Sequence, residues 1–458
     1  MQTFAELPLI PSLRHAVDAA GYTQPTPIQS GALPFILDGH DVIAQAPTGS
    51  GKTVAFGLGI LQRLDVPRAY TQALVLCPTR ELADQVAKEI RRLAIGIPNV
   101  KLTLITGGVP QGPQRASLSR APHIVVGTPG RVADLLERGV LDASGIMTVV
   151  LDEADRMLDM GFEQTLESIV ALLPKARQTL LFSATWPDAI RAMAHRALAD
   201  PREVVVDQAE SQPEVEQWFH EVEAEAKSAA LAGLLLQHRP ESAVVFCNTR
   251  RDVEELAGAL RAFGFASAAL HGDLEQRDRD EVLVRFANRS LGVLVASDVA
   301  ARGLDVKQLA CVVNYELPVD PDTYRHRVGR TARAGHSGLA LNLVAAREMP
   351  RALQLEALHG VPLRWVAAPL RPLTADKVSS APMVTLRLDA GRSDKLRPGD
   401  VLGALTGTVG LPAEAIGKID IFPKRAFVAV RRDLAEQALA GLRVGRIKGR
   451  SVRIQLIR

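Results

Sequence analysis

Residues 41–53 read "DVIAQAPTGSGKT", an apolar run that leads into a glycine-rich turn and a Lys-Thr pair. The apolar run predicts a buried strand and the residues after the turn predict a helix, so the turn joins a strand to a helix N-terminus. Backbone N–H groups around Gly49 and Gly51 can wrap phosphate oxygens there, and Lys52 can reach the β- and γ-phosphates. Thr53 can ligate Mg²⁺. The alternative interpretation is a glycine-rich turn that binds nothing.

Apolar runs alternate with amphipathic helical patterns from Asp41 onward, for example "ALVLCP" at 73–78 and "HIVVGT" at 123–128. Short buried runs separated by helices predict a parallel sheet with helices on both faces. The pattern pauses in a polar stretch near 206–217 and resumes with "AVVFCN" at 243–248. The fold class is therefore α/β, with the same parallel-sheet architecture used twice.

A third domain is indicated after a second pause at 366–382, which is rich in proline and serine and predicts a flexible tether. Beyond it the predicted elements follow in the order β-α-β-β-α-β, which is typical of a small ferredoxin-like α+β domain. This tail, 383–458, carries 15 Lys or Arg against 7 Asp or Glu, a net charge of +8, whereas the whole chain carries +3. Such a concentration of positive charge favours a nucleic acid as the partner of the tail. The expected boundaries are 1–207 for the first domain, 216–365 for the second, 366–382 for the linker and 383–458 for the third.

The composition is that of a globular protein, with 458 residues of which 47% are hydrophobic and 23% charged. No uncharged apolar run approaches the roughly 18 to 20 residues that a membrane-spanning helix needs, so we expect no membrane association. Cys77, Cys247 and Cys311 each lie in an apolar, strand-like run. Buried thiols of this kind are typical of a reducing compartment, which predicts a cytoplasmic protein. Nothing in the sequence indicates an obligate protein partner.

Two acidic residues follow another buried strand in "VVLDEAD", residues 149–155. Asp152 and Glu153 would lie at the carboxyl end of that strand, where α/β sheets place their ligands. Asp152 could hold the Mg²⁺ shell, and Glu153 could orient and deprotonate the attacking water. Alone, such a pair more often begins a solvated helix; after a phosphate loop on the same sheet, it favours catalysis.

A basic motif, "HRVGRTARAG" at 326–335, occupies the corresponding place in the second half. Arg330 and Arg333 lie three residues apart and could point from one face into a cleft between the domains. They would there supply the arginine-finger charge that stabilises phosphoryl transfer. The alternative is a basic, solvated helix face.

In this order, these segments resemble the motifs of the DEAD-box RNA helicases, in which two RecA-like domains close on ATP and RNA. The resemblance extends from Phe4 to about Arg364. It rests on "GYTQPTPIQ" (21–29), "APTGSGKT" (46–53), "PTREL" (78–82), "TPGR" (128–131), "DEAD" (152–155), "SAT" (183–185), "VVFCNTR" (244–250), "ASDVAARGLD" (296–305) and "HRVGRTARAG" (326–335).

The resemblance implies ATP and Mg²⁺ as cofactors and a set of nucleotide-binding residues. Gln29 would bond the adenine edge, with Tyr22 and Phe4 packed about the base, and Asp305 would meet the ribose. The implied set is Phe4, Tyr22, Gln29, Ala46, Pro47, Thr48, Gly49, Ser50, Gly51, Lys52, Thr53 and Asp305, of which Ala46 replaces the Gly of the standard loop pattern.

The same resemblance implies that RNA is held through its phosphates and sugars, with little sequence preference. The implied contacts are Arg80, Gly108, Thr128 and Arg131 in the first domain and Thr249, Gly272 and Ser297 in the second. Ser297 stands where the family usually has Thr and keeps the hydroxyl. Ser183 and Thr185 would couple the ATP site to the bound strand.

The tail resembles the C-terminal RNA-recognition domain of the DbpA subfamily on "RPGDVLGALTG", "IGKI" and "GRIKGRSVRI". That resemblance implies a hairpin of 23S ribosomal RNA as target and a role in assembly of the large (50S) subunit. However, "IFPKRAFVAVRRD", 421–433, lacks two aromatic residues of the usual base-stacking strand. We therefore expect Phe427 to lie in the core and the tail to bind RNA through its charge. The expected contacts are Lys424, Arg425, Arg446, Lys448 and Arg450.

Taken together, these features predict an ATP-dependent RNA helicase with RNA-stimulated ATP hydrolysis. The alternative is an ATP-gated RNA clamp or assembly scaffold that does not unwind productively. A DNA translocase of the same core architecture is a third possibility, which would require DNA to stimulate hydrolysis as well as RNA does.

Overall fold

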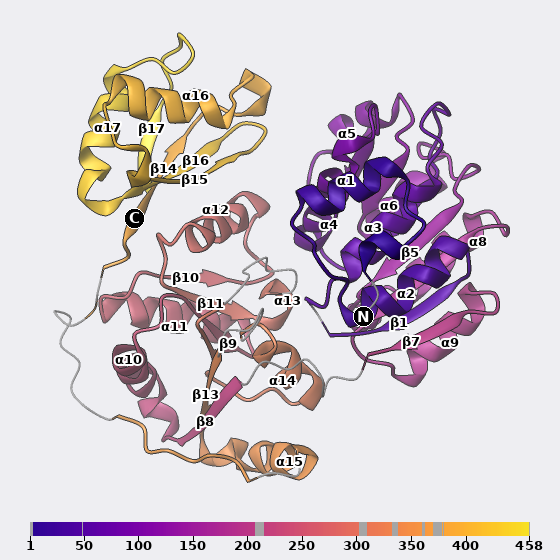
Figure 1. Cartoon of the computed structure of the whole chain (residues 1–458). Helices are drawn as coiled ribbons and strands as arrows, with labels where there is room; N and C mark the ends of the chain where they lie inside the picture. Colours follow the sequence, from indigo (N-terminus) through magenta and orange to yellow (C-terminus); the bar gives the residue numbers. More distant parts are fainter. Residues whose placement is uncertain are drawn as a thin grey trace. The chain divides into compact units, whose positions relative to one another are not determined.

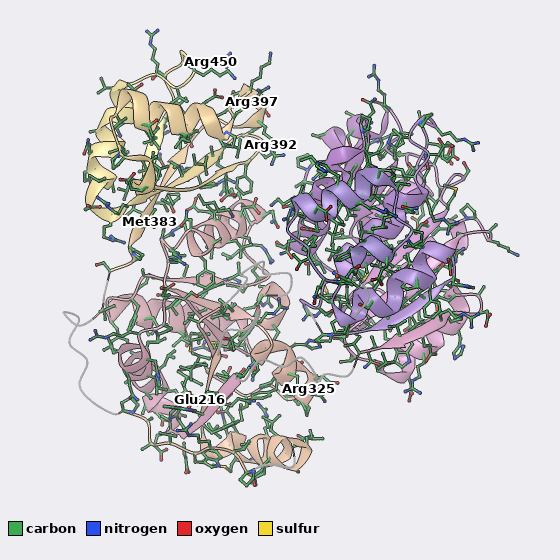
Figure 2. All side chains as sticks on the ribbon, in the orientation of Figure 1. Glu216, Arg325, Met383, Arg392, Arg397 and Arg450 are labelled. Atoms are coloured by element: carbon green, nitrogen blue, oxygen red, sulfur yellow. The ribbon has the colours of Figure 1, made fainter. Side chains whose placement is uncertain are left out.

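The computed structural model describes residues 3–47, 49–206, 215–301, 309–331, 338–359, 362–369, 378 and 380–457 (Figures 1 and 2). Its strands form three sheets, each from its own stretch of chain. Contacts divide the chain into two compact units, one built on the first sheet and the other on the second and third. Within the described part, no helix has both the length and the apolarity needed to cross a membrane.

Domain 1 is built on a seven-stranded sheet in the order β3-β4-β2-β5-β6-β1-β7, with all neighbouring pairs parallel. Its strands are β1 (Val42–Gln45), β2 (Ala73–Leu76), β3 (Leu102–Ile105), β4 (Ile124–Gly127), β5 (Thr148–Asp152), β6 (Gln178–Ser183) and β7 (Arg202–Val205). Its helices are α1 (Pro11–Ala19), α2 (Pro27–Asp38), α3 (Lys52–Arg63), α4 (Arg80–Leu93), α5 (Gln111–Leu118), α6 (Pro129–Glu137), α7 (Ala154–Asp159), α8 (Glu163–Leu172) and α9 (Asp188–Ala197).

Helices cover both faces of this sheet, as predicted. Val42 and Ala44 of β1 belong to one hydrophobic cluster, and Ile43 between them belongs to another. Since successive side chains of a strand point to opposite faces, each face has its own core. A strand buried on both faces is an apolar run without alternation, which is the pattern of the sequence here.

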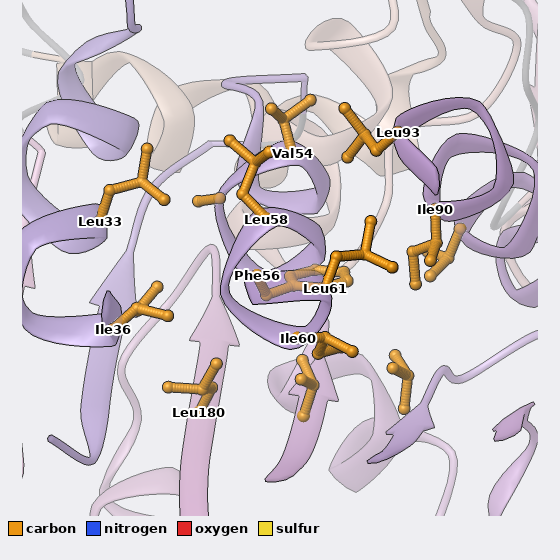
Figure 3. Close-up of a cluster of buried hydrophobic side chains, with 14 of the residues drawn as sticks. Leu33, Ile36, Val54, Phe56, Leu58, Ile60, Leu61, Ile90, Leu93 and Leu180 are labelled. Atoms are coloured by element: carbon orange, nitrogen blue, oxygen red, sulfur yellow. The ribbon is translucent and has the colours of Figure 1, made fainter. Parts of the chain in front are cut away.

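The first of these cores holds α3 in place behind the phosphate loop (Figure 3). Phe56 of α3 and Phe182 of β6 pack with ring centroids 5.3 Å apart. Gly59 allows α2 to approach closely, since a Cβ there would lie 2.2 Å from Ile36 Cγ2. The helix that begins at the loop is therefore fixed by dense packing along its length.

Domain 2 repeats the architecture with a six-stranded parallel sheet in the order β10-β11-β9-β12-β13-β8. Its strands are β8 (Val215–Glu221), β9 (Ala243–Cys247), β10 (Ser267–Leu270), β11 (Val293–Ser297), β12 (Cys311–Asn314) and β13 (Gly338–Val344). Its helices are α10 (Lys227–His238), α11 (Arg250–Ala262), α12 (Gln276–Ala287), α13 (Asp298–Ala301), α14 (Pro321–Val328) and α15 (Met349–His359). The order matches β3-β4-β2-β5-β6-β1 of domain 1, which confirms that one architecture is used twice.

Two edge strands differ from the sequence expectation. The polar stretch near 206–217 contains the start of β8, and β7 precedes it. Both are partly exposed and polar, with Glu203 in one and Glu216 in the other. Edge strands with charged side chains lack the apolar run on which the prediction depended.

Domain 3 has a four-stranded antiparallel sheet in the order β15-β16-β14-β17. Its elements are β14 (Met383–Leu388), α16 (Pro398–Gly403), β15 (Ile416–Ile421), β16 (Ala426–Arg431), α17 (Ala435–Val444) and β17 (Ile454–Ile457). The predicted order β-α-β-β-α-β is confirmed. Leu386, Val428 and Leu439 belong to a core shared by the sheet and its helices.

Candidate nucleotide site and RNA interface

The predicted phosphate loop lies between β1 and the first residue of α3. Gly49 and Gly51 have φ angles of 90° and 93°, in the left-handed region that favours glycine. A Cβ on Gly51 would also lie 2.4 Å from Gln29 Nε2, so this position has no room for a side chain. Lys52 is buried, and its Nζ donates a 2.8 Å hydrogen bond to the carbonyl of Ala46. The ammonium group therefore lies against the loop backbone, where a phosphate oxygen could replace that carbonyl.

Two residues that precede the phosphate loop in the chain, Thr26 and Gln29, hold it through hydrogen bonds. Gln29 Oε1 accepts a 3.0 Å hydrogen bond from Thr26 N, and Gln29 Nε2 donates one of 3.0 Å to Gly51 O. Thr26 Oγ1 donates to Ser50 O at 2.7 Å. A side-chain amide offers two donors and up to two acceptor sites, so Gln29 keeps one N–H and one lone pair for an adenine edge.

The two aromatic residues that were predicted to pack about the adenine base have different surroundings from each other. Phe4 is buried in the core cluster of α2 and α3. Tyr22 is half-buried; its hydroxyl donates a 2.7 Å hydrogen bond to Glu89, and burial raises its pKa to about 12. Their contact with the base stays a prediction.

The acidic pair lies at the carboxyl end of β5. Asp152 ends the strand, and Glu153 follows with φ 53° and ψ 54°, an unusual backbone conformation for a residue with a side chain. Both side chains are buried. Burial raises the pKa of Asp152 to about 7, the charge of Lys52 lowers it, and the charge of Glu153 raises it. Lys52 and the two carboxyl groups thus form one electrostatic cluster.

The oxygen donors that the phosphate loop and the acidic pair offer suit a magnesium ion. The hydroxyl of Thr53 and the carboxylate of Asp152 are hard oxygen ligands, and Mg²⁺ is usually held by one or two such groups plus phosphates and water. A divalent cation would also offset the burial that disfavours the ionised form of Asp152. These two residues would hold the ion.

Two neighbours that the sequence interpretation did not select support the pair. Arg156 Nη1 lies 3.1 Å from Glu153 Oε2, with both side chains at most 5% exposed. Asp155 Oδ2 accepts hydrogen bonds from Ala184 N at 3.1 Å, Thr185 N at 2.9 Å and Thr185 Oγ1 at 3.0 Å. The acidic motif and the predicted coupling segment are therefore joined by a buried carboxylate. Within this segment, Ser183 Oγ donates a 2.7 Å hydrogen bond to the carbonyl of Thr185.

The four RNA contacts predicted in domain 1 gather beyond the carboxyl ends of β2, β3 and β4. Gly108 has φ 68°, and a Cβ there would lie 2.5 Å from Arg80 Nη1, so the guanidinium lies directly against this loop. Thr128 Oγ1 accepts a 3.3 Å hydrogen bond from the same loop, and Arg131 Nη2 donates one of 3.2 Å to it. The structure brings all four together.

In domain 2 the predicted contacts occupy the equivalent edge. Ser297 ends β11, and Thr249 and Gly272 follow the neighbouring strands β9 and β10 within two residues. Ser297 pairs in register with Cys247, so the three positions lie at one end of the sheet. Parallel sheets place their ligands at this end.

Of the predicted arginine fingers, Arg330 lies just beyond α14 and is 7% exposed. Arg333, Asp305 and Thr48 lie outside the described residues.

The basic residues predicted in domain 3 lie in turns. Lys424 and Arg425 belong to the β15–β16 turn, where the Arg425 guanidinium lies over the Phe427 ring with its carbon 6.0 Å from the ring centroid. Arg446, Lys448 and Arg450 belong to the exposed turn before β17.

A second loop, which the sequence interpretation missed, joins this turn. Lys448 Nζ donates a 2.8 Å hydrogen bond to the carbonyl of Lys395, in the loop after β14 that also carries the exposed Arg392 and Arg397. Figure 2 shows Arg392, Arg397 and Arg450 at the end of the domain away from Met383. We call Arg392, Lys395, Arg397, Lys448 and Arg450 the basic loop surface.

The open face of the domain 3 sheet contacts domain 2 at β14. Thr385 of β14 is 0% exposed; its Oγ1 accepts a 2.9 Å hydrogen bond from Asn288 Nδ2 and lies 2.6 Å from Ser290 Oγ, just after α12. Phe427 pairs across the strands with Arg387, two residues along from Thr385 on the same face, and is 1% exposed. The prediction that Phe427 is buried is therefore confirmed. This face normally stacks on RNA bases, so its burial at Thr385 and Phe427 leaves the loops of domain 3 as the candidate RNA contacts.

Comparison with known proteins agrees with this arrangement. The model of the DEAD/DEAH box helicase family matches residues 26–193, that of the helicase conserved C-terminal domain matches 226–335, and that of the DbpA RNA binding domain matches 385–456. Two curated relatives cover much or all of the chain. The ATP-dependent RNA helicase DbpA of Escherichia coli (strain K12) is 50% identical over the full length of both chains. The DEAD-box ATP-dependent RNA helicase CshA of Geobacillus kaustophilus (strain HTA426) is 44% identical over 78% of this chain and 76% of its own.

Solved structures give the same result for the first two domains. The S. cerevisiae Dbp5 structure bound to RNA and ADP BeF3 matches with a TM-score of 0.73 and 31% identity, over 80% of this chain and 96% of its own. The matched domains, the phosphate loop and the acidic pair identify an enzyme that hydrolyses ATP. The chain therefore belongs to the DEAD-box RNA helicases, and within them to the DbpA subfamily.

Proposed function

We propose that this enzyme uses ATP to open short RNA duplexes locally, and that domain 3 directs it to a hairpin of 23S ribosomal RNA during assembly of the 50S subunit in the cytoplasm. The observation that carries the proposal is the connection within domain 1 between the acidic pair and the "SAT" segment. Asp155, next but one to Glu153, binds Thr185 with its buried carboxylate. Such a link can transmit a change at the nucleotide to a bound strand.

The roles of the site residues follow from their surroundings. Lys52 would bind the β- and γ-phosphates, and Glu153, held beside Arg156, would orient the attacking water and take its proton. Mg²⁺, held by Thr53 and Asp152, would neutralise charge on the phosphates. Arg330 would add positive charge from domain 2 as charge develops in the transition state.

RNA would be held by the two loop edges of domains 1 and 2, through contacts to its backbone. Backbone contacts position a strand without reading its sequence. Selection of one RNA target must then depend on another part of the chain. The basic loop surface of domain 3 would supply the positive charge that binds this RNA. The match of residues 385–456 to the DbpA RNA binding domain supports RNA as the ligand of domain 3.

A turnover assay tests the proposal. Wild-type hydrolysis should rise on addition of RNA, and Lys52→Ala and Glu153→Gln should each remove nearly all of it, by about a hundredfold or more. Glu137→Gln, an exposed residue of α6, is the matched control for the loss of one carboxylate.

Release of a labelled strand from a short RNA duplex separates helicase from clamp. Nucleotide-dependent RNA binding with no strand release would support an ATP-gated clamp. Equal stimulation by DNA and RNA would support a translocase. Normal turnover in Glu153→Gln would refute the assigned site.

A further inference from the structure

The chain does not leave domain 2 at the predicted start of the linker. Residues 364–366 lie along β8, the edge strand of the domain 2 sheet. Phe219 N donates a 2.9 Å hydrogen bond to Arg364 O, and Val366 N donates one of 2.8 Å to Phe219 O. A parallel bridge joins Phe219 to Trp365. The segment therefore pairs with the open edge of the sheet as a short additional strand.

Side chains hold the first part of this segment in place. The Arg364 guanidinium lies over the Trp218 ring with its carbon 4.7 Å from the ring centroid, and its Nη1 lies 2.5 Å from Glu216 Oε1. The rings of Trp365 and Phe219 pack with centroids 5.7 Å apart. A cation over an aromatic face, an ion pair and a ring contact are each attractive, so they hold the segment on β8 together.

The rest of the segment lies against α10. His220 is 0% exposed, and its Nδ1 donates a 2.8 Å hydrogen bond to Val366 O. A Cβ on Gly233, inside α10, would lie 2.6 Å from the carbonyl oxygen of Pro369. Glycine is less favourable than alanine in the interior of a helix. Its presence here allows the segment to approach the helix closely.

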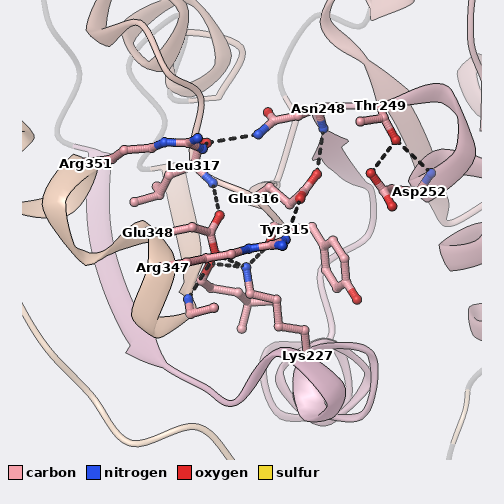
Figure 4. A network of polar contacts seen from close by, with 12 residues as sticks. Lys227, Asn248, Thr249, Asp252, Tyr315, Glu316, Leu317, Arg347, Glu348 and Arg351 are labelled. Atoms are coloured by element: carbon pink, nitrogen blue, oxygen red, sulfur yellow. Dashed lines mark hydrogen bonds and ion pairs between the residues drawn. The ribbon is translucent and has the colours of Figure 1, made fainter.

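The helix that receives the segment is itself fixed (Figure 4). Lys227 begins α10, and its Nζ donates hydrogen bonds to the carbonyls of Tyr315 at 2.7 Å and Leu343 at 3.0 Å. The same ammonium pairs with Glu348, and both side chains are at most 4% exposed. Since α10 is attached in this way to β13 and to the residue after β12, it offers a firm support.

Residues 364–369, which we call the strap, shorten the stretch of chain between domains 2 and 3. Domain 3 begins at Ala381, whose carbonyl accepts a 2.5 Å hydrogen bond from Arg432 Nε. With the strap in place, 11 residues, 370–380, separate the two domains, whereas 17 would separate Leu363 from domain 3 without it. The effective concentration of a tethered partner falls roughly as the −3/2 power of the length of a flexible linker, so the strap raises it about twofold.

We propose that the strap is a conformational device that keeps domain 3 docked on domain 2 by shortening the connection between them. Release of the strap lengthens this connection and lets domain 3 leave its contact at Thr385 more often. Under the proposed function, that release would take the RNA selected by domain 3 away from the RNA edge of domain 2. The device does not require RNA, so its test uses the protein alone.

The test uses a double variant of the full chain, Gly233→Ala with Arg364→Glu. The first change places a Cβ where Pro369 lies and favours the helix itself, so folding is not at risk. The second replaces a cation by a carboxylate beside the exposed Glu216. The matched control, Gly258→Ala with Arg364→Lys, keeps the cation and adds a Cβ on α11 where the nearest other group lies 3.9 Å away.

Two measurements are made on these proteins. Peptides that cover the strap should exchange amide hydrogens faster in the double variant, as measured by mass spectrometry. For the second measurement, all proteins carry Thr385→Cys, at a position that is 0% exposed while domain 3 is docked; the three native cysteines are buried. The rate at which a thiol reagent labels this position is proportional to the fraction of molecules in which domain 3 is undocked.

The labelling rate should rise about twofold in the double variant and stay at the wild-type value in the control. Six Gly and Ser residues inserted between 369 and 370 lengthen the connection without changing the strap, so this insertion should give the same twofold rise. An unchanged labelling rate in the double variant would overturn the proposal. Unchanged exchange in the strap would also overturn it, because these contacts would then not hold the segment. A rise much larger than that caused by the insertion would show that length is not the cause.

Discussion

Asp152 gives the most quantitative prediction, because its environment penalises the ionised form in the absence of nucleotide and metal. Its ordinary pKa is 3.8, and burial raises the value to about 7 in the folded chain. A carboxyl group whose folded pKa is raised destabilises the fold as pH rises from the unfolded value through the folded one. The penalty is absent at low pH and complete above the folded pKa. Asp152→Asn removes it.

The magnitude follows from the difference of about three pH units, each worth about 1.4 kcal/mol. At about pH 8 the variant should be more stable than wild type by about 4 kcal/mol, and at about pH 5 by roughly 1 to 2 kcal/mol, since Asp152 is then protonated in the folded chain. The same change should abolish ATP hydrolysis. A residue that destabilises its own domain but is needed for activity is typical of a catalytic site.

Urea unfolding followed by Trp186 fluorescence measures this difference. The chain has three tryptophans, and Trp186 is the one in domain 1. With Trp218→Phe and Trp365→Phe in the background of both proteins, the signal reports domain 1 alone. A stability gain that is the same at both pH values would refute the reasoning, because it would show that ionisation of Asp152 is not the cause.

Three further predictions concern the contact of Asp155 with Thr185, the contact of domain 3 with domain 2, and the binding of RNA by domain 3. Asp155→Ala leaves the buried N–H and hydroxyl of Thr185 without their acceptor, so the ratio of RNA-stimulated to basal ATP turnover should fall about tenfold; an unchanged ratio would argue against coupling through this residue. Thr385→Arg places a charge in the buried contact with Asn288, so peptides from α12 should exchange amide hydrogens faster in a mass-spectrometric assay, and wild-type protection would contradict the docked arrangement. Replacing Lys448 and Arg450 by Gln should reduce the slope of log affinity for a ribosomal hairpin against log salt concentration by about one to two. An unchanged slope would show that these two residues do not contact the RNA phosphates.

Much of the fold was predictable because its strands are buried on both faces. "VVLDE" or "AVVFC" has no alternation, and such runs between amphipathic helices indicate a parallel sheet. The edge strands β7 and β8 were missed for the opposite reason, since half-exposed strands with glutamates resemble a polar linker. The order of elements in domain 3 was predictable from apolar runs and turn residues alone.

The candidate site was only partly predictable. The phosphate loop and acidic pair have their own local signatures, so Lys52 and Glu153 could be found in the sequence. The interactions of the buried Arg327 of α14 could not be, because the four residues to which its side chain donates hydrogen bonds lie up to 79 residues away. Nothing in the sequence around Thr385 indicates that domain 2 covers it.

The residues of the basic loop surface show a similar limit. Lys448 and Arg450 stand in a short basic run that draws attention. Arg392 and Arg397 are separated from them by more than 50 residues, and the folded chain connects the two segments through bonds from Lys448 to the carbonyl of Lys395 and to Asp400. Contacts between distant segments depend on tertiary packing, which local patterns do not encode.

The most direct test of the account measures strand release by the full chain on two RNA substrates. Both carry the same short duplex, joined in one case to a hairpin fragment of 23S ribosomal RNA and in the other to an unrelated hairpin of equal length. With ATP present, release should be faster on the ribosomal fragment, and the preference should disappear when Lys448 and Arg450 are replaced by Gln, a change that leaves the buried Thr385 contact intact. Equal release rates on both substrates with the wild-type chain would contradict the claim that domain 3 directs the helicase.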